Sequence, residues 1–206
     1  MKIVSAQFER CAFSPKDFPK PDLPEIAFAG RSNVGKSSLI NTLVHRKHLV
    51  KVSSTPGKTR SINFFNINGK VRFIDLPGYG YAHVPTRVQE SWKPLIESYL
   101  TARPVLVLVV FIMDIRRDVG KGDLMLWEWL HHANKEIVPV CTKADKIPFG
   151  EIRERMAHLS VFLQAEAPLI PFSSRTGMGK DEVWSRIYKG IQSSYGPGAP
   201  RASVMK

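Results

Sequence analysis

The chain has 206 residues, a length typical of one globular domain or of two small ones. Hydrophobic residues make up 43% of it and charged residues 23%, which excludes a disordered, collagen-like or coiled-coil chain. The 30 Lys and Arg against 18 Asp and Glu give a formal net charge of +12. That excess favours a polyanionic partner, either nucleic acid or an anionic membrane surface.

The sequence has no feature typical of a secreted or membrane-spanning protein. Its two cysteines, Cys11 and Cys141, are too few for a disulfide framework and show no metal-ligand spacing. Arg10 interrupts the apolar run that a signal peptide needs. The longest apolar run, residues 105–113, is about half of the ~20 residues of a membrane helix. We therefore expect a cytoplasmic protein with no membrane partner.

Apolar runs alternate with segments of helical spacing, a pattern typical of a parallel sheet with helices on both faces. Asn68 and Gly69 form the strongest short hairpin signal, between residues 61–67 and 71–74, so one antiparallel strand is expected in an otherwise parallel sheet. The other predicted strands are residues 26–29, 105–113, 137–141 and 169–172. Apolar helix faces are predicted around residues 39–44, 152–163 and 183–191.

The chain shows no internal repeat and no interdomain linker, so we expect a single α/β domain over residues 24–192. Both ends look loose. Residues 1–23, which include a proline-spaced segment, are expected to be an N-terminal extension, and residues 193–206, rich in Gly, Pro and Ser, a flexible tail.

Residues 30–37 read GRSNVGKS, which fits the pattern GxxxxGK[ST] between a predicted strand and a predicted helix. The two glycines let the backbone turn its N–H groups toward phosphate oxygens, and the helix adds its positive N-terminal end. The lysine would reach the outer phosphates, and the serine would offer a hydroxyl to Mg²⁺. The predicted phosphate-binding loop is Gly30, Arg31, Ser32, Asn33, Val34, Gly35, Lys36 and Ser37.

Two tetrapeptides follow predicted strands, at the edge where ligands bind in open α/β sheets. DLPG at 75–78 places an acid that can hold Mg²⁺ through water and a glycine N–H that can meet the γ-phosphate. In TKAD at 142–145, Asp145 can accept two hydrogen bonds from guanine that adenine does not supply, and the stem of Lys143 can lie along the base. The predicted positions are Asp75, Leu76, Pro77 and Gly78 on the phosphate side and Thr142, Lys143, Ala144 and Asp145 on the guanine side.

These motifs resemble the EngB (YihA/YsxC) ribosome-assembly GTPases, among the translation-factor-related GTPases, over roughly residues 24–192. The resemblance rests on GRSNVGKSSLIN, SSTPGKTRSINFF, FIDLPGYGYA, VFIMDIRR, TKADK and PFSSRTGMGK. It implies a Ras-like P-loop GTPase domain with two switch segments and Mg²⁺-dependent GTP hydrolysis. It also implies a role in building the large ribosomal subunit, linked to cell division and septation.

The resemblance further implies the remaining contacts. Thr59 would be the switch threonine that ligates Mg²⁺ beside Ser37 and, through water, Asp75, whereas Thr55 precedes a proline and is better suited to shaping the loop. Thr142 stands where Asn is commoner, and its hydroxyl can serve instead. The first switch would comprise Gly57, Lys58, Thr59, Arg60 and Ser61, and the second switch Asp75, Leu76, Pro77 and Gly78. The last guanine contacts would be Phe172, Ser173 and Ser174, where Ser173, Ser174 and Arg175 replace the usual Ser-Ala-Lys.

Two departures bear on hydrolysis. Tyr79 stands where many GTPases carry the Gln that orients the attacking water, so intrinsic hydrolysis is expected to be slow and Tyr79 itself to be packed or exposed on a mobile loop. Asn33 matches the asparagine that holds K⁺ in relatives such as MnmE. It can equally cap the following turn, and the sequence leaves both alternatives open.

No acid occurs between Glu25 and Asp75, while basic residues cluster around the first switch. This suits either a GTP-gated contact with RNA phosphates or a solvated basic face. The favoured function is a monomeric, GTP-gated assembly factor on ribosomal RNA. The alternative is a GTP-dependent protein-interaction switch at the division septum without ribosomal RNA, although the chain shows no amphipathic anchor or lipidation motif. The candidate RNA contacts are Arg46, Lys47, Lys51, Lys58 and Arg60.

Overall fold

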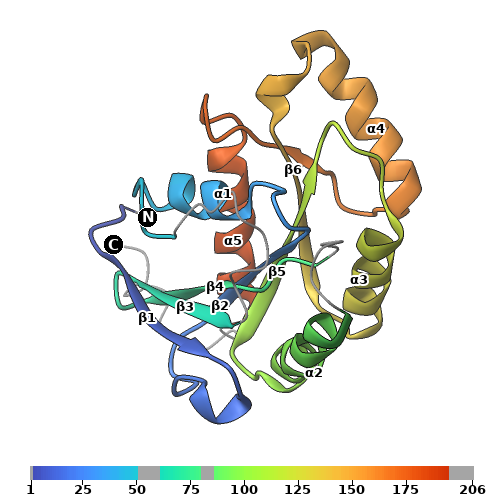
Figure 1. Cartoon of the computed structure of the whole chain (residues 1–206). Helices are drawn as coiled ribbons and strands as arrows, with labels where there is room; N and C mark the ends of the chain where they lie inside the picture. Colours follow the sequence, from blue (N-terminus) through green and yellow to red (C-terminus); the bar gives the residue numbers. More distant parts are fainter. Residues whose placement is uncertain (1, 51–60, 80–85, 195–206) are drawn as a thin grey trace.

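The computed structural model describes residues 2–50, 61–79 and 86–194, with the backbone alone for 86–93 (Figure 1). Its centre is a seven-stranded sheet in the order β1-β3-β4-β2-β5-β6-β7. The strands are β1 (Ala6–Ala12), β2 (Glu25–Gly30), β3 (Ile62–Ile67), β4 (Val71–Asp75), β5 (Leu106–Asp114), β6 (Glu136–Thr142) and β7 (Ile170–Pro171). The helices are α1 (Lys36–Leu43), α2 (Thr86–Ala102), α3 (Lys121–His132), α4 (Ile152–Leu163) and α5 (Lys180–Ser194), with short 3-10 turns η1 (Pro15–Asp17), η2 (Ala144–Lys146) and η3 (Phe149–Glu151).

The sheet is mostly parallel, as predicted. β4, β2, β5, β6 and β7 pair in parallel, whereas β3 pairs antiparallel with both of its neighbours, β1 and β4. β3 and β4 form the predicted hairpin, in which Asn68 and Gly69 both have positive φ angles, 56° and 64°. Within the described sheet, β3 is therefore the single strand that runs against the others.

The prediction that both ends of the chain are loose is wrong at the N-terminus. β1, which lies within the expected extension 1–23, pairs with β3 along its length and forms an edge of the sheet. The residues before it are also held, because Asn68 Oδ1 accepts hydrogen bonds of 2.8 Å from the N–H groups of Val4 and Ser5. In addition, Arg46 Nη2 donates to the carbonyl oxygen of Val4 at 3.1 Å. β3 would otherwise leave a row of backbone groups without strand partners.

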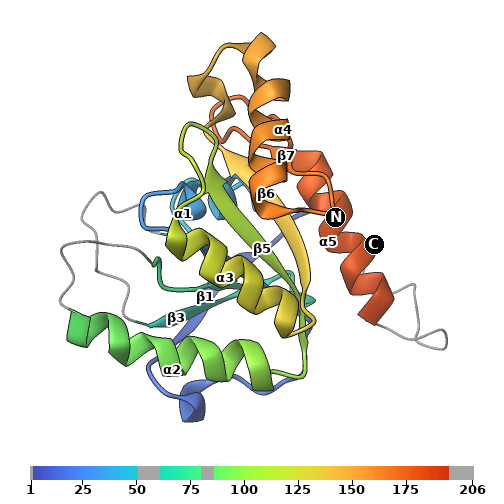
Figure 2. The same ribbon diagram turned by 90° about the vertical axis from the view of Figure 1, so that its right-hand side faces the viewer.

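Helices cover both faces of the sheet (Figures 1 and 2). Alternate residues of β5 point to opposite faces: Val109 and Phe111 pack with α2, α3 and α4, whereas Leu108 and Val110 pack with α1 and α5. All four side chains are buried. This explains why the central strands read as continuous apolar runs, because each is buried from two sides.

Glu25 is fully buried at the first residue of β2. Its carboxylate accepts hydrogen bonds from Tyr99 Oη at 2.8 Å and from Arg103 Nε and Nη2 at 2.8 and 2.5 Å. A buried carboxylate is tolerated only with such partners. The pairing joins the C-terminal end of α2 to the sheet at the edge opposite the predicted ligand loops.

Four of the predicted binding segments, GRSNVGKS, DLPG, TKAD and the segment with Ser173 and Ser174, lie at the carboxyl ends of β2, β4, β6 and β7. Because β4, β2, β5, β6 and β7 are parallel neighbours, these ends lie along one edge of the sheet. The fold therefore brings four motifs together that are widely separated in the sequence.

Candidate nucleotide-binding site

The loop between β2 and α1 has the shape that the sequence predicts for phosphate binding. Asn33 and Gly35 adopt left-handed conformations, with φ angles of 63° and 105°. Gly35 is the N-cap of α1, and no described side chain caps this helix, so its first N–H groups are available to an anion. At Gly30 a Cβ would lie 2.7 Å from the carbonyl oxygen of Ile112, which explains why the loop begins with glycine.

Lys36 and Asp75 are brought together, as the motifs predict. Lys36 Nζ forms an ion pair with Asp75 Oδ1, and both side chains are largely buried. Ser37 follows in the first turn of α1. The hydroxyl of Ser37 and the carboxylate of Asp75 supply oxygen ligands of the kind that Mg²⁺ binds together with phosphate oxygens. Among the described residues, no group of three or more His, Cys, Asp or Glu side chains could hold a metal ion.

The DLPG segment is bonded directly to the phosphate-binding loop. The N–H of Ser32 donates to the carbonyl oxygen of Tyr79 at 3.1 Å, and Ser32 Oγ to that of Gly78 at 3.4 Å. A Cβ on Gly78 would lie 2.9 Å from Ser32 Oγ, so this approach needs glycine. The two segments are therefore in direct hydrogen-bond contact.

Tyr79 is packed rather than left exposed on its loop. Its hydroxyl donates to Asp123 Oδ1 at 2.8 Å, and Asp123 Oδ2 accepts from the N–H of Gly120 at 2.8 Å. Arg31 lies 3.7 Å from the same carboxylate. Burial, the charge of Asp123 and this hydrogen bond raise the pKa of Tyr79 far above its usual value, so the phenol remains protonated.

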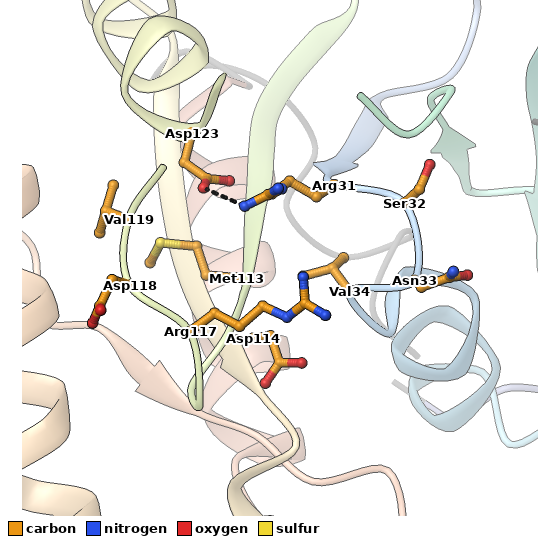
Figure 3. Close-up of a pocket in the computed structure, with 10 residues that line it drawn as sticks. All are labelled: Arg31, Ser32, Asn33, Val34, Met113, Asp114, Arg117, Asp118, Val119 and Asp123. Carbon is orange, nitrogen blue, oxygen red and sulfur yellow. Dashed lines mark ion pairs between the residues drawn. The ribbon is translucent and has the colours of Figure 1, made fainter. Parts of the chain in front are cut away.

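Figure 3 shows a pocket beside the phosphate-binding loop. Arg31 and Asn33 line it from that loop, Asp114 and Arg117 line it from the end of β5 and the segment after it, and Asp123 lines it from α3. The ion pair of Arg31 with Asp123 crosses one end. The pocket therefore lies between the phosphate-binding loop and the segment that joins β5 to α3.

The two predicted guanine segments also meet. The hydroxyl of Ser173 donates to Asp145 Oδ1 at 2.7 Å, and the N–H of Ala144 donates to the carbonyl oxygen of Phe172 at 3.1 Å. The hydrogen bond from Ser173 lowers the pKa of Asp145, which keeps this carboxylate ionised as an acceptor. Ser174 is exposed beside them.

Thr142 and Lys143 join the guanine side to the phosphate side. Thr142 Oγ1 is hydrogen-bonded to the carbonyl oxygen of Val34 and lies 2.9 Å from that of Met113. The hydroxyl of Thr142 therefore has hydrogen-bond partners at the motif position where Asn is commoner. Lys143 Nζ donates to the carbonyl oxygen of Asn33 at 2.8 Å.

Several predicted residues lie outside the described residues or away from this cluster. Ser61 is buried, and its hydroxyl donates to Asn63 Oδ1 at 3.1 Å. Arg46 and Lys47 are exposed after α1. The predicted residues outside the described ranges are Lys51, Thr55, Gly57, Lys58, Thr59 and Arg60.

Sequence reasoning missed two acids of the site, Asp114 and Asp123. Asp114 ends β5, so its place after a strand of the ligand-binding edge was an available signal. Asp123 lies in the first turn of α3, and nothing in its local sequence distinguishes it from an ordinary helix acid.

This fold and this site define a P-loop GTP-binding protein with a Ras-like domain. Comparison with known proteins agrees: the profile of a family described as "50S ribosome-binding GTPase" matches residues 25–143. A protein of Syntrophus aciditrophicus named "Probable GTP-binding protein EngB" is 50% identical over 190 residues, 92% of this chain and 96% of that protein. One of the same name from Geobacter metallireducens is 48% identical over 188 residues, 91% and 92% of the two chains. The chain belongs to the EngB family of GTP-binding proteins and is a GTPase.

Solved structures show the same fold. A crystal structure of a probable GTP-binding protein engB matches with a TM-score of 0.69 at 24% identity, over 82% of this chain and 99% of that one. Era, crystallised with MgGDPNP and nucleotides 1506–1542 of 16S ribosomal RNA, matches with a TM-score of 0.65 at 23% identity, over 81% of this chain and 56% of that one. In the part of the chain that the structure describes, no helix is long and apolar enough to cross a membrane.

Proposed function

We propose that this GTPase is a nucleotide-gated assembly factor for the large ribosomal subunit in the cytoplasm, with a consequent role in cell division and septation. The observation that carries the proposal is the bonding of Ser32 to Gly78 and Tyr79. Because the two segments touch, the nucleotide in the loop and the position of the second switch cannot vary independently. The family description and the net charge of +12 support ribosomal RNA as the partner.

We assign the nucleotide contacts as the motifs predict. Gly30 to Ser37 would hold the phosphates, with Lys36 exchanging the carboxylate of Asp75 for the outer phosphates. Mg²⁺, which this family of GTPases generally uses, would be held by Ser37, by Thr59 and through water by Asp75, and it would neutralise phosphate charge. The guanine would be held by Asp145 and its neighbours Thr142, Lys143, Ala144, Phe172, Ser173 and Ser174.

Hydrolysis would proceed by attack of water on the γ-phosphorus, with release of phosphate and GDP. Lys36 and the N–H of Gly78 would stabilise the developing charge. Tyr79 does not replace the missing Gln, because its hydroxyl is bonded to Asp123, and intrinsic turnover would therefore be slow. Asn33 would supply a K⁺ ligand, and its alternative role is to cap the turn that follows it.

The RNA-binding surface would lie around the first switch. Arg46 and Lys47 are exposed after α1, and Lys51, Lys58 and Arg60 would lie with them on this surface in the GTP-bound form. Contacts of this kind release counterions from RNA, so affinity should fall steeply with salt.

Cosedimentation with purified large subunits tests the proposal. Protein loaded with a non-hydrolysable GTP analogue should bind more tightly than protein loaded with GDP, and replacement of Lys51, Lys58 and Arg60 by Ala should reduce both the affinity and its salt dependence. A matched control replaces Lys16, Arg153 and Lys189, three bases exposed on other elements, by Ala. If the affinity for large subunits is the same with GTP analogue and GDP, or falls equally in both triple variants, a protein-interaction switch at the septum would be favoured instead.

A further inference from the structure

Asp114 is a buried carboxylate with an unusually complete set of donors. Its side chain is 3% exposed at the end of β5. Arg116 donates Nε to Oδ1 at 2.9 Å and Nη2 to Oδ2 at 2.8 Å, and the backbone N–H of Arg116 lies 3.1 Å from Oδ1. Lys143 Nζ donates to Oδ2 at 2.8 Å. Although burial favours the neutral acid, the hydrogen bonds from Arg116 and Lys143 hold the pKa of Asp114 at about 2, so it is charged at neutral pH.

The ammonium of Lys143 is held from two sides. It bridges Asp114 Oδ2 on β5 and the carbonyl oxygen of Asn33 in the phosphate-binding loop, each at 2.8 Å. Figure 3 shows Asp114 and Asn33 on these two sides of the pocket. A lysine side chain restricted in this way loses considerable rotamer entropy, which must be offset by its contacts. The bridge therefore determines where the stem of Lys143 lies.

The backbone of Lys143 is held by its neighbours in the chain rather than by this bridge. Its φ angle is +62°, a left-handed conformation that a residue with a Cβ adopts at a cost of roughly 1 kcal/mol. Thr142 and Ala144 on either side are tied to other elements by their own hydrogen bonds. The fixed ends of the tetrapeptide set the left-handed turn, and Asp114 and Asn33 fix the side chain that leaves it.

We propose that Asp114 is a positioning residue for guanine binding, acting through Lys143. By holding the ammonium against the phosphate-binding loop, it keeps the methylene stem in place as a platform for the base and connects base binding to phosphate binding. This rests on the proposed role of residues 142–145 in binding guanine. In this role Asp114 would act through its contact with the lysine rather than by touching the nucleotide.

A double-mutant cycle tests the proposal, with dissociation of a fluorescent GDP analogue as the readout. Asp114→Asn should speed dissociation about tenfold, equivalent to ~1.4 kcal/mol. Lys143→Met, which keeps a stem but removes the ammonium, should have a similar effect, and Asp114→Asn should add little to it. If Asp114 had only a structural role, Asp114→Asn would speed dissociation by the same factor in the starting protein and in Lys143→Met, and that result would overturn the proposal.

Two further variants keep the test decisive. Asp118→Asn makes the same chemical change in the same segment, at an exposed acid paired with Arg155, and should leave dissociation unchanged. If Asp114→Asn does not fold, Arg116→Ala, at a half-exposed residue, should speed dissociation severalfold in the starting protein and not in Lys143→Met. No effect there would overturn the proposal. Guanine-over-adenine preference that survives Asp145→Asn would count against the proposed nucleotide function itself, separately from Asp114.

Discussion

The phenolic oxygen of Tyr79 lies 2.8 Å from Oδ1 of Asp123, which connects the residue after DLPG to the first turn of α3. Asp123 is 4% exposed, and its other oxygen accepts from the backbone of Gly120. The end of the DLPG segment is therefore held at two points, through the carbonyl oxygen of Tyr79 on Ser32 and through the side chain of Tyr79 on Asp123.

Tyr79→Phe is expected to lower the free energy of unfolding of the nucleotide-free protein by about 1–2 kcal/mol, because Asp123 loses a donor while staying buried. Turnover should stay within about twofold, since this hydroxyl does not orient the attacking water. Urea unfolding and phosphate release measure the two effects. Tyr188→Phe is the control: its hydroxyl is buried with no hydrogen-bond partner among the described residues, so its removal should cost nothing. A tenfold loss of turnover in Tyr79→Phe would show that the phenol takes part in hydrolysis.

Lys36→Ala should weaken GTP and GDP binding by roughly 10- to 100-fold, because one charged hydrogen bond to phosphate is worth about 1.5–3 kcal/mol. Ser37→Ala should retain more binding but lose hydrolysis, since its hydroxyl serves Mg²⁺. Isothermal titration calorimetry and phosphate release distinguish these effects, with far-UV circular dichroism to confirm folding. Unchanged turnover in both variants would mean that the loop does not bind phosphate.

Asp145→Asn should reduce affinity for GDP by roughly 100-fold and favour xanthine nucleotides, because an amide presents a donor where guanine needs an acceptor. Competition of GDP, XDP and ADP against a fluorescent nucleotide gives the three affinities directly. Ser173→Ala, which removes the hydrogen bond to Asp145 but not the carboxylate, should weaken GDP binding less. If the unmutated protein binds ADP as well as GDP, the guanine assignment is wrong.

Asn33→Ala tests the proposed K⁺ site. K⁺ should accelerate turnover of the starting protein relative to Na⁺ at the same ionic strength, and the variant should show one rate in both salts. The backbone of Asn33 has a left-handed φ of 63°, so the variant's folding should be checked by thermal unfolding. Equal rates for the starting protein in the two salts would make this asparagine structural.

The pKa of Asp114 leads to a prediction for acid stability. Its value of about 2 lies below the ordinary 3.8, so the ionised carboxylate stabilises the folded state above pH 3.8 and that stabilisation is lost as the pH falls through 2. Between pH 5 and 3, about 1 kcal/mol of it should disappear. Urea unfolding at the two pH values should therefore show that the free energy of unfolding falls by about 1 kcal/mol less in Asp114→Asn than in the starting protein. Equal losses in the two proteins would contradict the pKa assigned to this group.

The parts of the site that sequence reasoning predicted are those encoded in short, contiguous segments. The phosphate-binding loop depends on glycines at fixed spacing between a strand and a helix, and DLPG and TKAD each follow a buried strand, so the parallel topology brings them together. The Asn68 and Gly69 hairpin was predictable for the same reason, because its turn geometry is set by two adjacent residues.

The features that were missed depend on partners far away in the sequence. β1 is an edge strand in which buried and exposed residues do not alternate, so its sequence lacks the two-residue hydrophobic pattern typical of a strand. Only its pairing with β3 defines it as a strand. The segment 169–172 is a strand only over Ile170–Pro171, because only these two residues pair with β6. Asp114 and Lys143 are 29 residues apart, and their contact exists only once β5 and β6 have paired.

The edge position of the N-terminal segment has a practical consequence for expressing this protein. The carbonyl oxygen of Val4 is hydrogen-bonded to Arg46, one of the bases proposed to face RNA, and the carbonyl oxygen of Lys2 accepts from Asn68. An affinity tag fused ahead of this segment would add chain directly beside that surface. Ribosome-binding measurements should therefore use protein from which an N-terminal tag has been cleaved, with the tagged form as a comparison for steric interference.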